Sequence, residues 1–192
     1  MLWFDRVSFA YRAGSPVLDR LSFLLRDGDR MTVTGESGCG KSTLLSLAAG
    51  LRKPTGGRVL CNTKKIACVF QEPRLFPWMT VSDNLCAVLP HGADRRTVVS
   101  EMLAQVGLSG TESLYPSELS GGMRSRVALA RGLLYRGDLY LLDEPFASLD
   151  AALRRRLTGL LLRHLEATGA SAILVTHQPE DAKRFGGKRL EL

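Results

Sequence analysis

The sequence predicts an α/β protein built around a largely parallel sheet. Short segments rich in β-forming residues alternate along the chain with segments whose apolar residues recur at helical spacing. A glycine-rich loop at residues 35–40 joins a predicted strand directly to a predicted helix, as expected in a βα unit. The stretch 73–135 consists almost entirely of predicted helices and loops, which indicates a helical insertion on one side of the sheet.

The chain is long enough to form one domain with its own core. It has 192 residues, of which 45% are hydrophobic and 23% are charged. This composition excludes disordered, collagen-like and disulfide-scaffold proteins. We therefore expect a single domain over residues 1–192, with a core made from residues 1–72 and 136–192 and a helical subdomain over residues 73–135.

The predicted strands are short and are separated by turns. A turn at Asp27-Gly28 divides the first two strands from the third, so we expect the first two to form an antiparallel appendage to the main sheet. Residues 171–176 form the last strand that the pattern predicts clearly. In chain order the expected strands are residues 7–11, 18–25, 30–34, 58–61, 66–70, 138–142 and 171–176.

The predicted helices carry apolar stripes. In the segment 151–167, for example, Leu153, Leu157 and Leu161 recur every fourth residue and would face a core. The segment 95–106 shows a similar stripe. The expected helices are residues 41–51, 81–89, 95–106, 120–135 and 151–167.

The chain is basic, with a formal net charge of +7 and an isoelectric point of about 9.6. A basic chain suits polyanionic partners such as nucleic acid, anionic lipid or phosphorylated small molecules, but a moderate charge also keeps an ordinary domain soluble. The basic residues are scattered, and the tightest run, residues 154–156, fits one solvated turn of a helix. This distribution favours the second interpretation.

Cysteine usage and hydropathy exclude other classes. The four cysteines show no Cys-x-x-Cys spacing and there are only three histidines, so we expect reduced thiols of a cytosolic protein and no zinc site. The N-terminus carries Asp5 and no long apolar region, so it does not predict a signal peptide. No apolar run approaches the length of about 18 residues that crosses a bilayer.

A phosphate-binding motif occupies the glycine-rich loop. Residues 35–43 match the G-x-x-x-x-G-K-[ST] (Walker A) pattern between a predicted strand and a predicted helix. Glycines let backbone N–H groups surround phosphate oxygens, and the helix N-terminus adds partial positive charge. Lys41 would supply a cation to the β- and γ-phosphates, and Ser42 would ligate Mg²⁺. The expected nucleotide-binding residues are Gly35, Glu36, Ser37, Gly38, Cys39, Gly40, Lys41, Ser42 and Thr43.

Two acidic residues follow the apolar strand predicted at residues 138–142. Ligands of open α/β sheets bind beyond the carboxyl ends of the strands, where Asp143 and Glu144 would lie. Asp143 could hold Mg²⁺, and Glu144 could act as the general base that polarises an attacking water. Taken alone, the acidic pair could equally begin a helix. The turn Ser120-Gly121-Gly122 could likewise be a helix N-cap or a second anion-binding turn.

The order of these motifs resembles the nucleotide-binding domain of ATP-binding cassette (ABC) transporters. The resemblance covers essentially the whole chain and implies a RecA-like P-loop NTPase core that hydrolyses ATP. A small GTPase fits less well, because the segment 62–65 does not supply an Asn-Lys-x-Asp guanine-binding motif. The motifs that carry the resemblance are residues 35–43, Gln71, Leu119-Ser-Gly-Gly-Met123, Leu141-Leu-Asp-Glu-Pro145, Ser148-Leu-Asp150 and His177.

The resemblance implies a role for each matching residue. Tyr11 would stack on the adenine ring, which gives modest selectivity. Gln71 would link Mg²⁺ and the attacking water to the helical subdomain, and His177 would contact the γ-phosphate. The expected catalytic residues are therefore Lys41, Gln71, Glu144 and His177, and the expected Mg²⁺ ligands are Ser42, Gln71 and Asp143.

The resemblance also implies a second copy of the chain. The signature motif residues Ser120, Gly121 and Gly122 would clamp the γ-phosphate bound by that copy, and Asp150 would lie across the same interface. We therefore expect an ATP-dependent head-to-tail dimer with twofold symmetry. Met123 stands where glutamine is frequent in the family, but the clamp uses the residues before it. The chain ends soon after the last motif, so we expect a minimal domain without a C-terminal regulatory domain.

Further partners follow from the resemblance. Transport would require separate membrane-spanning permease subunits, docked near residues 72–90, and importers would add a solute-binding protein. The segment 71–84 is similar to that of bacterial importer ATPases of the nitrate, sulfonate, taurine and thiamine group, which implies a peripheral subunit at the cytoplasmic face of the inner (plasma) membrane. We expect no nucleic-acid partner; the alternative is a soluble ABC-type ATPase that acts on nucleic acid or ribosomes. The apolar residues of this segment could form an exposed patch that docks the permease, or they could pack within the helical insertion. These residues are Leu75, Phe76, Trp78 and Met79.

Overall fold

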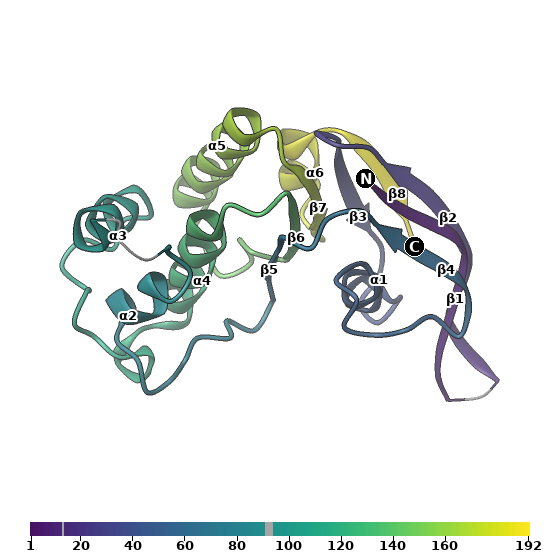
Figure 1. Cartoon of the computed structure of the whole chain (residues 1–192), viewed down its shortest axis with the longest axis horizontal. Helices are drawn as coiled ribbons and strands as arrows, with labels where there is room; N and C mark the ends of the chain where they lie inside the picture. Colours follow the sequence, from purple (N-terminus) through teal and green to yellow (C-terminus); the bar gives the residue numbers. More distant parts are fainter. Residues whose placement is uncertain (13, 91–93) are drawn as a thin grey trace.

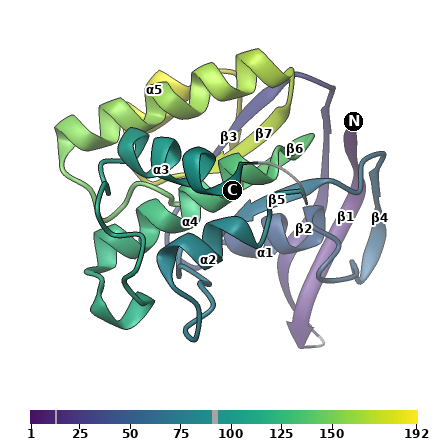
Figure 2. The same cartoon turned by 60° about the vertical axis from the view of Figure 1, so that its left-hand side comes forward.

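The computed structural model describes residues 1–12, 14–90 and 94–192 and contains two sheets with helices between and beside them. A three-stranded antiparallel sheet lies at one end of the molecule and the short helix α1 (Lys41–Ala48) packs between it and a five-stranded parallel sheet (Figure 1). The remaining helices cover the other face of the parallel sheet, and the long helix α5 (Ala151–Thr168) runs beside it in both views (Figure 2). The predicted α/β fold class is confirmed.

The parallel sheet has the strand order β5-β6-β7-β3-β8, and every neighbouring pair is parallel. Chain order and spatial order differ, so the strands are joined by crossovers through helices. Its strands are β3 (Arg30–Thr34), β5 (Ile66–Val69), β6 (Leu139–Asp143), β7 (Ser171–Val175) and β8 (Lys188–Glu191).

Two hydrophobic cores lie on opposite faces of this sheet, because successive side chains of a strand point to opposite sides. In β6, Leu139 and Leu141 pack with α1 and the antiparallel sheet, whereas Tyr140 and Leu142 pack with the helices of the other side. All five side chains of β6 are buried. The strand that ends in the acidic pair is therefore fixed by packing on both faces.

The antiparallel sheet has the order β2-β1-β4 and is more extensive than the sequence pattern predicts. Its strands are β1 (Leu2–Arg12), β2 (Ser15–Leu25) and β4 (Gly56–Cys61). The missed beginning of β1 contains the buried Leu2 and Phe4, but the alternation is interrupted at Arg6, whose φ is +47°. This irregularity shifts the register between Phe4 and Val7, so the apolar residues on either side do not read as one period-2 strand.

The five predicted helices begin within one residue of their predicted starts, and three of them end earlier than predicted. Side chains of Thr80, Asp94, Ser120 and Asp150 accept hydrogen bonds from first-turn backbone N–H groups and so fix four helix starts. Besides α1 and α5, the helices are α2 (Val81–Cys86), α3 (Arg95–Gln105), a 3₁₀ turn (Pro116–Glu118), α4 (Gly121–Tyr135) and α6 (Pro179–Phe185).

Two elements at the end of the chain were not predicted. Helix α6 is too short to show a period, and β8 has the polar sequence Lys-Arg-Leu-Glu at a sheet edge. Residues 171–176 are therefore not the end of the ordered sheet. A Cβ on Gly187 would lie 2.2 Å from the carbonyl oxygen of Arg30, so glycine permits the close approach of this segment to the start of β3.

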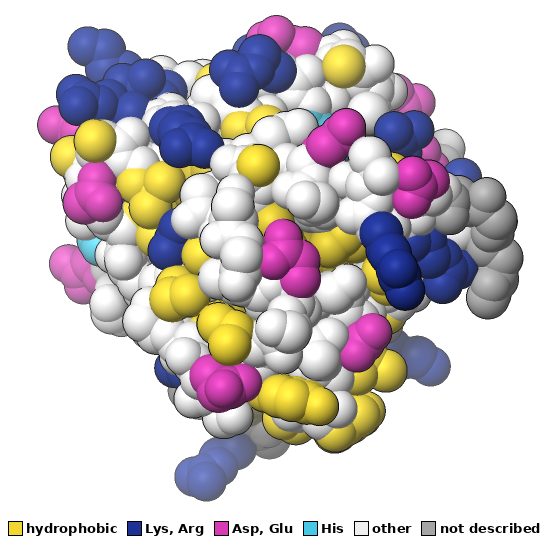
Figure 3. Space-filling model, turned by 90° about the vertical axis from the view of Figure 1, so that its left-hand side faces the viewer, with side chains coloured by type: hydrophobic (Ala, Val, Ile, Leu, Met, Phe, Trp, Pro, Cys, Tyr) yellow, Lys and Arg dark blue, Asp and Glu magenta, His cyan; other side chains and the backbone are white. Residues whose placement is uncertain are grey.

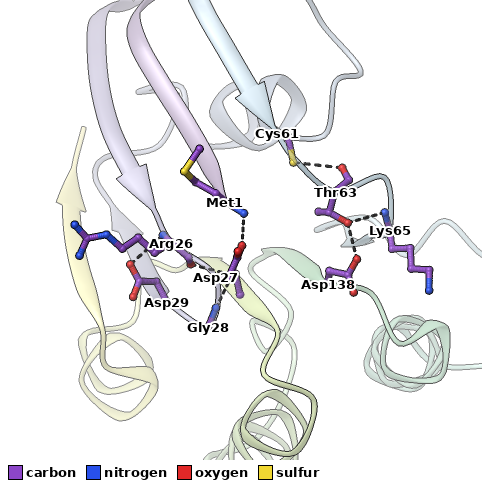
Figure 4. Close-up of polar contacts among 10 residues, drawn as sticks. Met1, Arg26, Asp27, Gly28, Asp29, Cys61, Thr63, Lys65 and Asp138 are labelled. Carbon is purple, nitrogen blue, oxygen red and sulfur yellow. Dashed lines mark hydrogen bonds and ion pairs between the residues drawn. The ribbon is translucent and has the colours of Figure 1, made fainter.

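Polar contacts tie the antiparallel sheet to the amino ends of the parallel strands (Figure 4). The Thr63 hydroxyl donates to the Asp138 carboxylate at 2.6 Å and accepts from the Lys65 backbone N–H at 3.1 Å. On the neighbouring side, the Met1 amino group contacts Asp27. These contacts lie at the end of the sheet opposite to Asp143 and leave the carboxyl ends free for a ligand.

Arginines hold the helical side of the molecule together through backbone carbonyl groups. Arg126 and Arg156, from α4 and α5, donate to carbonyl oxygens of residues 104–107 at the end of α3 and thereby cap that helix. Arg131 bridges from α4 to the carbonyl oxygen of Arg74. Figure 3 shows this side of the molecule, with one group of basic side chains at the upper left, another at the right, and acidic side chains dispersed between them. Part of the excess of arginine therefore has a structural use.

We expect one half-buried histidine, His164, to make the free energy of unfolding depend on pH. The Tyr140 hydroxyl lies 2.7 Å from His164 Nε2, which joins β6 to α5. Burial raises the pKa of Tyr140 to about 12 and lowers the pKa of His164 below its usual 6.5. As the pH falls below about 6.5, the unfolded chain takes up a proton that folded His164 does not, so the free energy of unfolding decreases.

Urea denaturation at pH 7.5 and at lower pH measures this effect. The contribution of His164 is fully present above its unfolded pKa and decreases below it, with a slope of at most about 1.4 kcal/mol per pH unit. The free energy of unfolding of the wild type should fall relative to that of His164→Gln as the pH is lowered, because only the wild type carries the titrating imidazole. A difference independent of pH would contradict the assignment of a neutral His164.

Candidate active site

A cleft of about 610 Å³ opens at the carboxyl ends of β3 and β6. It collects residues from the antiparallel sheet, the glycine-rich loop, α1 and the acidic pair, which are far apart in the sequence. Most of the sequence-predicted nucleotide-binding residues meet here. The lining residues are Tyr11, Val17, Ser37, Gly38, Gly40, Lys41, Ser42, Thr43, Gln71, Asp143 and Glu144.

The glycine-rich loop wraps around the ammonium group of Lys41. Lys41 Nζ donates to the carbonyl oxygens of Gly35 at 2.8 Å and Glu36 at 2.6 Å. The side chain is buried, and within the described residues it forms no ion pair with a carboxylate. A buried cation without a counter-ion attracts an anion strongly.

Backbone geometry requires glycine at position 40. Its φ is +106°, and a Cβ there would lie 2.8 Å from Val17 Cγ1. Gly40 is also the N-cap of α1 and no side chain caps this helix, so first-turn N–H groups remain available to a ligand. The glycine-rich loop, the N-terminus of α1 and Lys41 therefore place positive charge together in this part of the cleft.

The oxygen donors of the cleft fit Mg²⁺. Asp143 is buried, and this burial raises the pKa of its carboxyl group, while a hydrogen bond from Ser42 and the charge of Lys41 act in the opposite direction. Gln71 lines the same cleft. A hydroxyl, a carboxylate and an amide oxygen are hard ligands that suit Mg²⁺, which usually takes few protein ligands and adds water and phosphate oxygens. Within the described residues, no cluster of three or more His, Cys, Asp or Glu side chains forms a fuller metal cage.

Glu144 and His177 form a contact that the sequence did not predict. Glu144 Oε2 lies 2.9 Å from His177 Nδ1, and the other ring nitrogen of His177 lies 3.0 Å from Gln178 Nε2. Glu144 has a φ of +47°, uncommon for a residue with a side chain, and its N–H donates to the Val175 carbonyl oxygen at 3.0 Å. The contact joins the ends of β6 and β7, and the unusual backbone conformation is held by the sheet.

The signature motif and Asp150 do not line the cleft. Ser120 is exposed and caps α4, accepting from the Met123 N–H at 3.3 Å, and Asp150 caps α5. A Cβ on Gly122 would lie 3.2 Å from the Ser148 carbonyl oxygen, so the two motifs adjoin each other on the surface. Within one chain they form a second polar surface separate from the phosphate-binding loop.

Two features of this region were not predicted from the sequence. Val17 follows Tyr11 across the β1–β2 connection and lines the cleft, but an isolated valine carries no motif. The Tyr11 hydroxyl lies 2.9 Å from Thr43 Oγ1, which connects the antiparallel sheet to α1. Nothing in the local sequence around either residue reveals this contact.

Phosphate groups are the ligands that a glycine-rich loop around a buried lysine can hold, so fold and cleft together define a P-loop nucleoside triphosphatase. Within that class, the chain belongs to the ABC transporter family. The sequence model of the family described as "ABC transporter" matches residues 18–147, more than half of the chain. This membership confirms the resemblance seen in the order of the motifs.

Relatives and solved structures support the same assignment. The aliphatic sulfonates import ATP-binding protein SsuB 2 of Pseudomonas syringae pv. tomato is 44% identical, over 93% of this chain and 75% of that protein. The formylaminopyrimidine import ATP-binding protein ThiZ of Halalkalibacterium halodurans is 40% identical, over 95% of this chain and 75% of that protein. A dimeric post-hydrolysis structure of the ATP-binding cassette MJ0796, bound to ADP and Pi, is 29% identical, with a TM-score of 0.91 over 100% of this chain and 94% of that one.

Proposed function

We propose that the chain is the ATP-binding and ATP-hydrolysing subunit of an ABC importer. The observation that carries this proposal is the buried Lys41 ammonium, centred in a glycine-rich loop beside Asp143 and Glu144 at the carboxyl ends of the sheet. Relatives at 40–44% identity are import ATP-binding proteins for aliphatic sulfonates and formylaminopyrimidine. Phosphate release from ATP by the purified chain tests the activity.

The residues of the cleft divide the work of hydrolysis. Water attacks the γ-phosphorus while the bond to the oxygen bridging the β- and γ-phosphates breaks, giving ADP and phosphate. Glu144 accepts the proton of the attacking water, and His177, which holds the Glu144 carboxylate at 2.9 Å, orients it and can then contact the γ-phosphate. Lys41 and the loop N–H groups bind the phosphate oxygens and stabilise charge that develops on them.

Mg²⁺ would be held by Ser42, Asp143 and Gln71 together with phosphate oxygens. When bound, the cation neutralises part of the triphosphate charge and orients the phosphates. Gln71 also lies on the loop that leads from β5 into the helical subdomain, for which we keep the boundaries 73–135 as a proposal. The position of Gln71 between the cleft and the helical subdomain supports a coupling of nucleotide binding to movement of these helices.

A second copy of the chain would complete each site. Ser120, Gly121 and Gly122 form an exposed helix start beside Ser148, and a helix N-terminus with free N–H groups favours a phosphate. Solved relatives are described as dimers, one with ADP and Pi bound. In a head-to-tail dimer this surface and Asp150 of each copy cover the other copy's Lys41 loop.

The conformational change driven by ATP hydrolysis would be transmitted to membrane-spanning permease subunits. Within the described parts of the chain, no helix combines the length and apolar character needed to cross a membrane. The loop before α2 carries the exposed aromatic residues Phe76 and Trp78, with exposed fractions of 39% and 71%, whereas Leu75 packs against the core. These aromatic residues support a surface on this chain that docks the permease. The likeness to import ATP-binding proteins supports the rest of the proposal, a position at the cytoplasmic face of the membrane and a solute-binding protein as a further component.

One buried asparagine fixes this loop. Asn84 is fully buried; its side-chain oxygen accepts from the Phe76 N–H at 2.8 Å, and its amide nitrogen, which has two hydrogens to donate, lies 3.0–3.1 Å from the carbonyl oxygens of Phe76, Met79 and Thr80. These contacts of one side chain hold the loop in place while leaving its aromatic groups outside. An exposed, rigid aromatic pair is typical of an interface anchor.

Trp78→Ala is expected to weaken docking without affecting ATP hydrolysis by the isolated chain. Loss of an aromatic anchor should reduce affinity for the permease about tenfold. The measurement is the fraction of the chain recovered with membranes from cells that also make the transporter. Tyr135→Ala, which removes another exposed aromatic group from the end of α4, is the matched control. Equal recovery of the Trp78 variant and the wild type would contradict the docking surface.

The soluble nucleic-acid or ribosome-associated ATPase is not favoured. The relatives named above are import proteins, and several arginines of the helical side are engaged with carbonyl groups. Addition of duplex DNA or ribosomes to the purified chain should leave its ATPase rate unchanged. Strong stimulation by either would support the alternative.

A further inference from the structure

Arg52 stacks on the aromatic residue of the nucleotide cleft. Its guanidinium carbon lies 4.9 Å from the centre of the Tyr11 ring and 5.9 Å from the centre of the Phe9 ring. Both distances are within the range of a cation–π contact, about 6 Å. Arg52 forms no ion pair or side-chain hydrogen bond within the part of the chain that the structure describes. The aromatic rings are therefore its partners.

The Tyr11 ring is restrained at several points. Its hydroxyl lies 2.9 Å from Oγ1 of the buried Thr43 in α1, and its ring meets the Phe9 ring edge-on, with centres 5.0 Å apart. The Arg52 backbone N–H donates to the Ser46 carbonyl oxygen at 3.3 Å, so Arg52 is anchored to the same helix. Helix α1, which begins at the phosphate-binding loop, therefore positions both the hydroxyl group and the ring face of Tyr11.

Tyr11 lines the nucleotide cleft and remains 57% exposed although Arg52 lies over its ring. Arg52 is not among the residues that line this cleft; it lines two neighbouring hollows, one of which shares Ser42, Gln71 and Asp143 with the cleft. The guanidinium group therefore supports the ring at the edge of the cleft, while more than half of the Tyr11 surface stays open to a ligand.

We propose that Arg52 is a positioning residue for nucleotide binding, which backs the Tyr11 ring so that the base meets an aromatic surface already fixed in place. This inference rests on the proposed stacking of Tyr11 on adenine. A ring that is ordered before binding loses less rotational freedom when the base arrives. Arg52 therefore contributes to binding of the base and not to binding of the phosphates.

Nucleotide binding by Arg52→Ala tests the proposal. Calorimetric titration with ADP measures base and phosphate binding together, and displacement of bound ADP by inorganic tripolyphosphate measures phosphate binding alone. Arg52→Ala should weaken ADP binding about two- to fivefold, the loss expected for one exposed cation–π contact, and leave the affinity for tripolyphosphate unchanged. The KM for ATP should rise by the same factor at constant kcat. Lys53→Ala, the same charge change one residue later, should alter neither affinity.

Comparison with Tyr11→Ala separates the two proposals. If Arg52 acts through the ring, Arg52→Ala should have no further effect in the Tyr11→Ala background. Unchanged ADP affinity in Tyr11→Ala would overturn the stacking role of Tyr11 itself. A loss in Tyr11→Ala with none in Arg52→Ala would overturn only the role of Arg52. An equal loss for tripolyphosphate would make Arg52 a phosphate ligand, and tighter ADP binding would make it a competitor of the base; either result contradicts the proposal.

Discussion

Glu144→Gln is expected to abolish ATP turnover while ATP still binds. The amide keeps the size and most contacts of the carboxylate, including its place 2.9 Å from His177, but cannot accept the proton of the attacking water. Loss of a general base costs about 10²–10⁴-fold in rate, so kcat should fall at least about hundredfold. Phosphate release measures kcat, and equilibrium titration should give a Kd for ATP close to that of the wild type.

The same substitution is expected to preserve the ATP-bound dimer. Without hydrolysis, triphosphate remains between Lys41 of one copy and Ser120 of the other, so size-exclusion chromatography in ATP should show the variant at dimer mass. Glu101→Gln, an exposed residue of α3, is the control for the change in charge. Turnover at the wild-type rate in Glu144→Gln would remove Glu144 from the role of base, and a monomer in saturating ATP would contradict the shared site.

Lys41→Ala is expected to reduce ATP affinity roughly 10- to 100-fold, the loss typical of a charged hydrogen bond to a buried site. The substitution removes the only cation that the described loop places at its centre and leaves the carbonyl oxygens of Gly35 and Glu36 without their donor. Both effects weaken phosphate binding. Equilibrium dialysis with labelled ATP measures the affinity directly.

Two controls make the Lys41 result specific. Lys64→Ala removes an exposed lysine outside the cleft and should bind ATP normally. Thermal unfolding of Lys41→Ala shows whether the fold is retained. We expect it to be retained, because the loop lies outside both hydrophobic cores. Unchanged ATP affinity in a folded Lys41→Ala protein would contradict the assignment of residues 35–43 as the phosphate-binding loop.

The parts of the site that could be predicted from sequence are those that depend on neighbouring residues. The phosphate-binding loop is one continuous segment, and its conformation follows from glycines at fixed positions beside a helix start. Asp143 and Glu144 could be placed because a buried strand ends there. Contacts such as Glu144 with His177, or Tyr11 with Thr43, join distant segments, and only the tertiary fold determines their distances.

The fold was predicted less well at its edges than in its centre. Strand β6 is apolar from Leu139 to Leu142 and was placed within one residue, whereas the edge strand β8 has only Leu190 as an apolar residue and was missed. The start of β1 was missed because the irregularity at Arg6 interrupts the period of two. In the proposed dimer the surroundings of Ser120 and Asp150 come from a second chain, and the fold of one chain does not determine them.

Strand β6 couples the two halves of the molecule because it belongs to both hydrophobic cores. Leu141 and Tyr140 are consecutive, yet one supports the side that carries α1 and the antiparallel sheet and the other supports the helices. Unfolding of either half would expose one face of the strand that carries Asp143. Asp143 consequently lies on a strand that is packed on both faces, and Glu144 follows it directly, so we expect the surrounding loops and helices to move with little displacement of these two carboxylates.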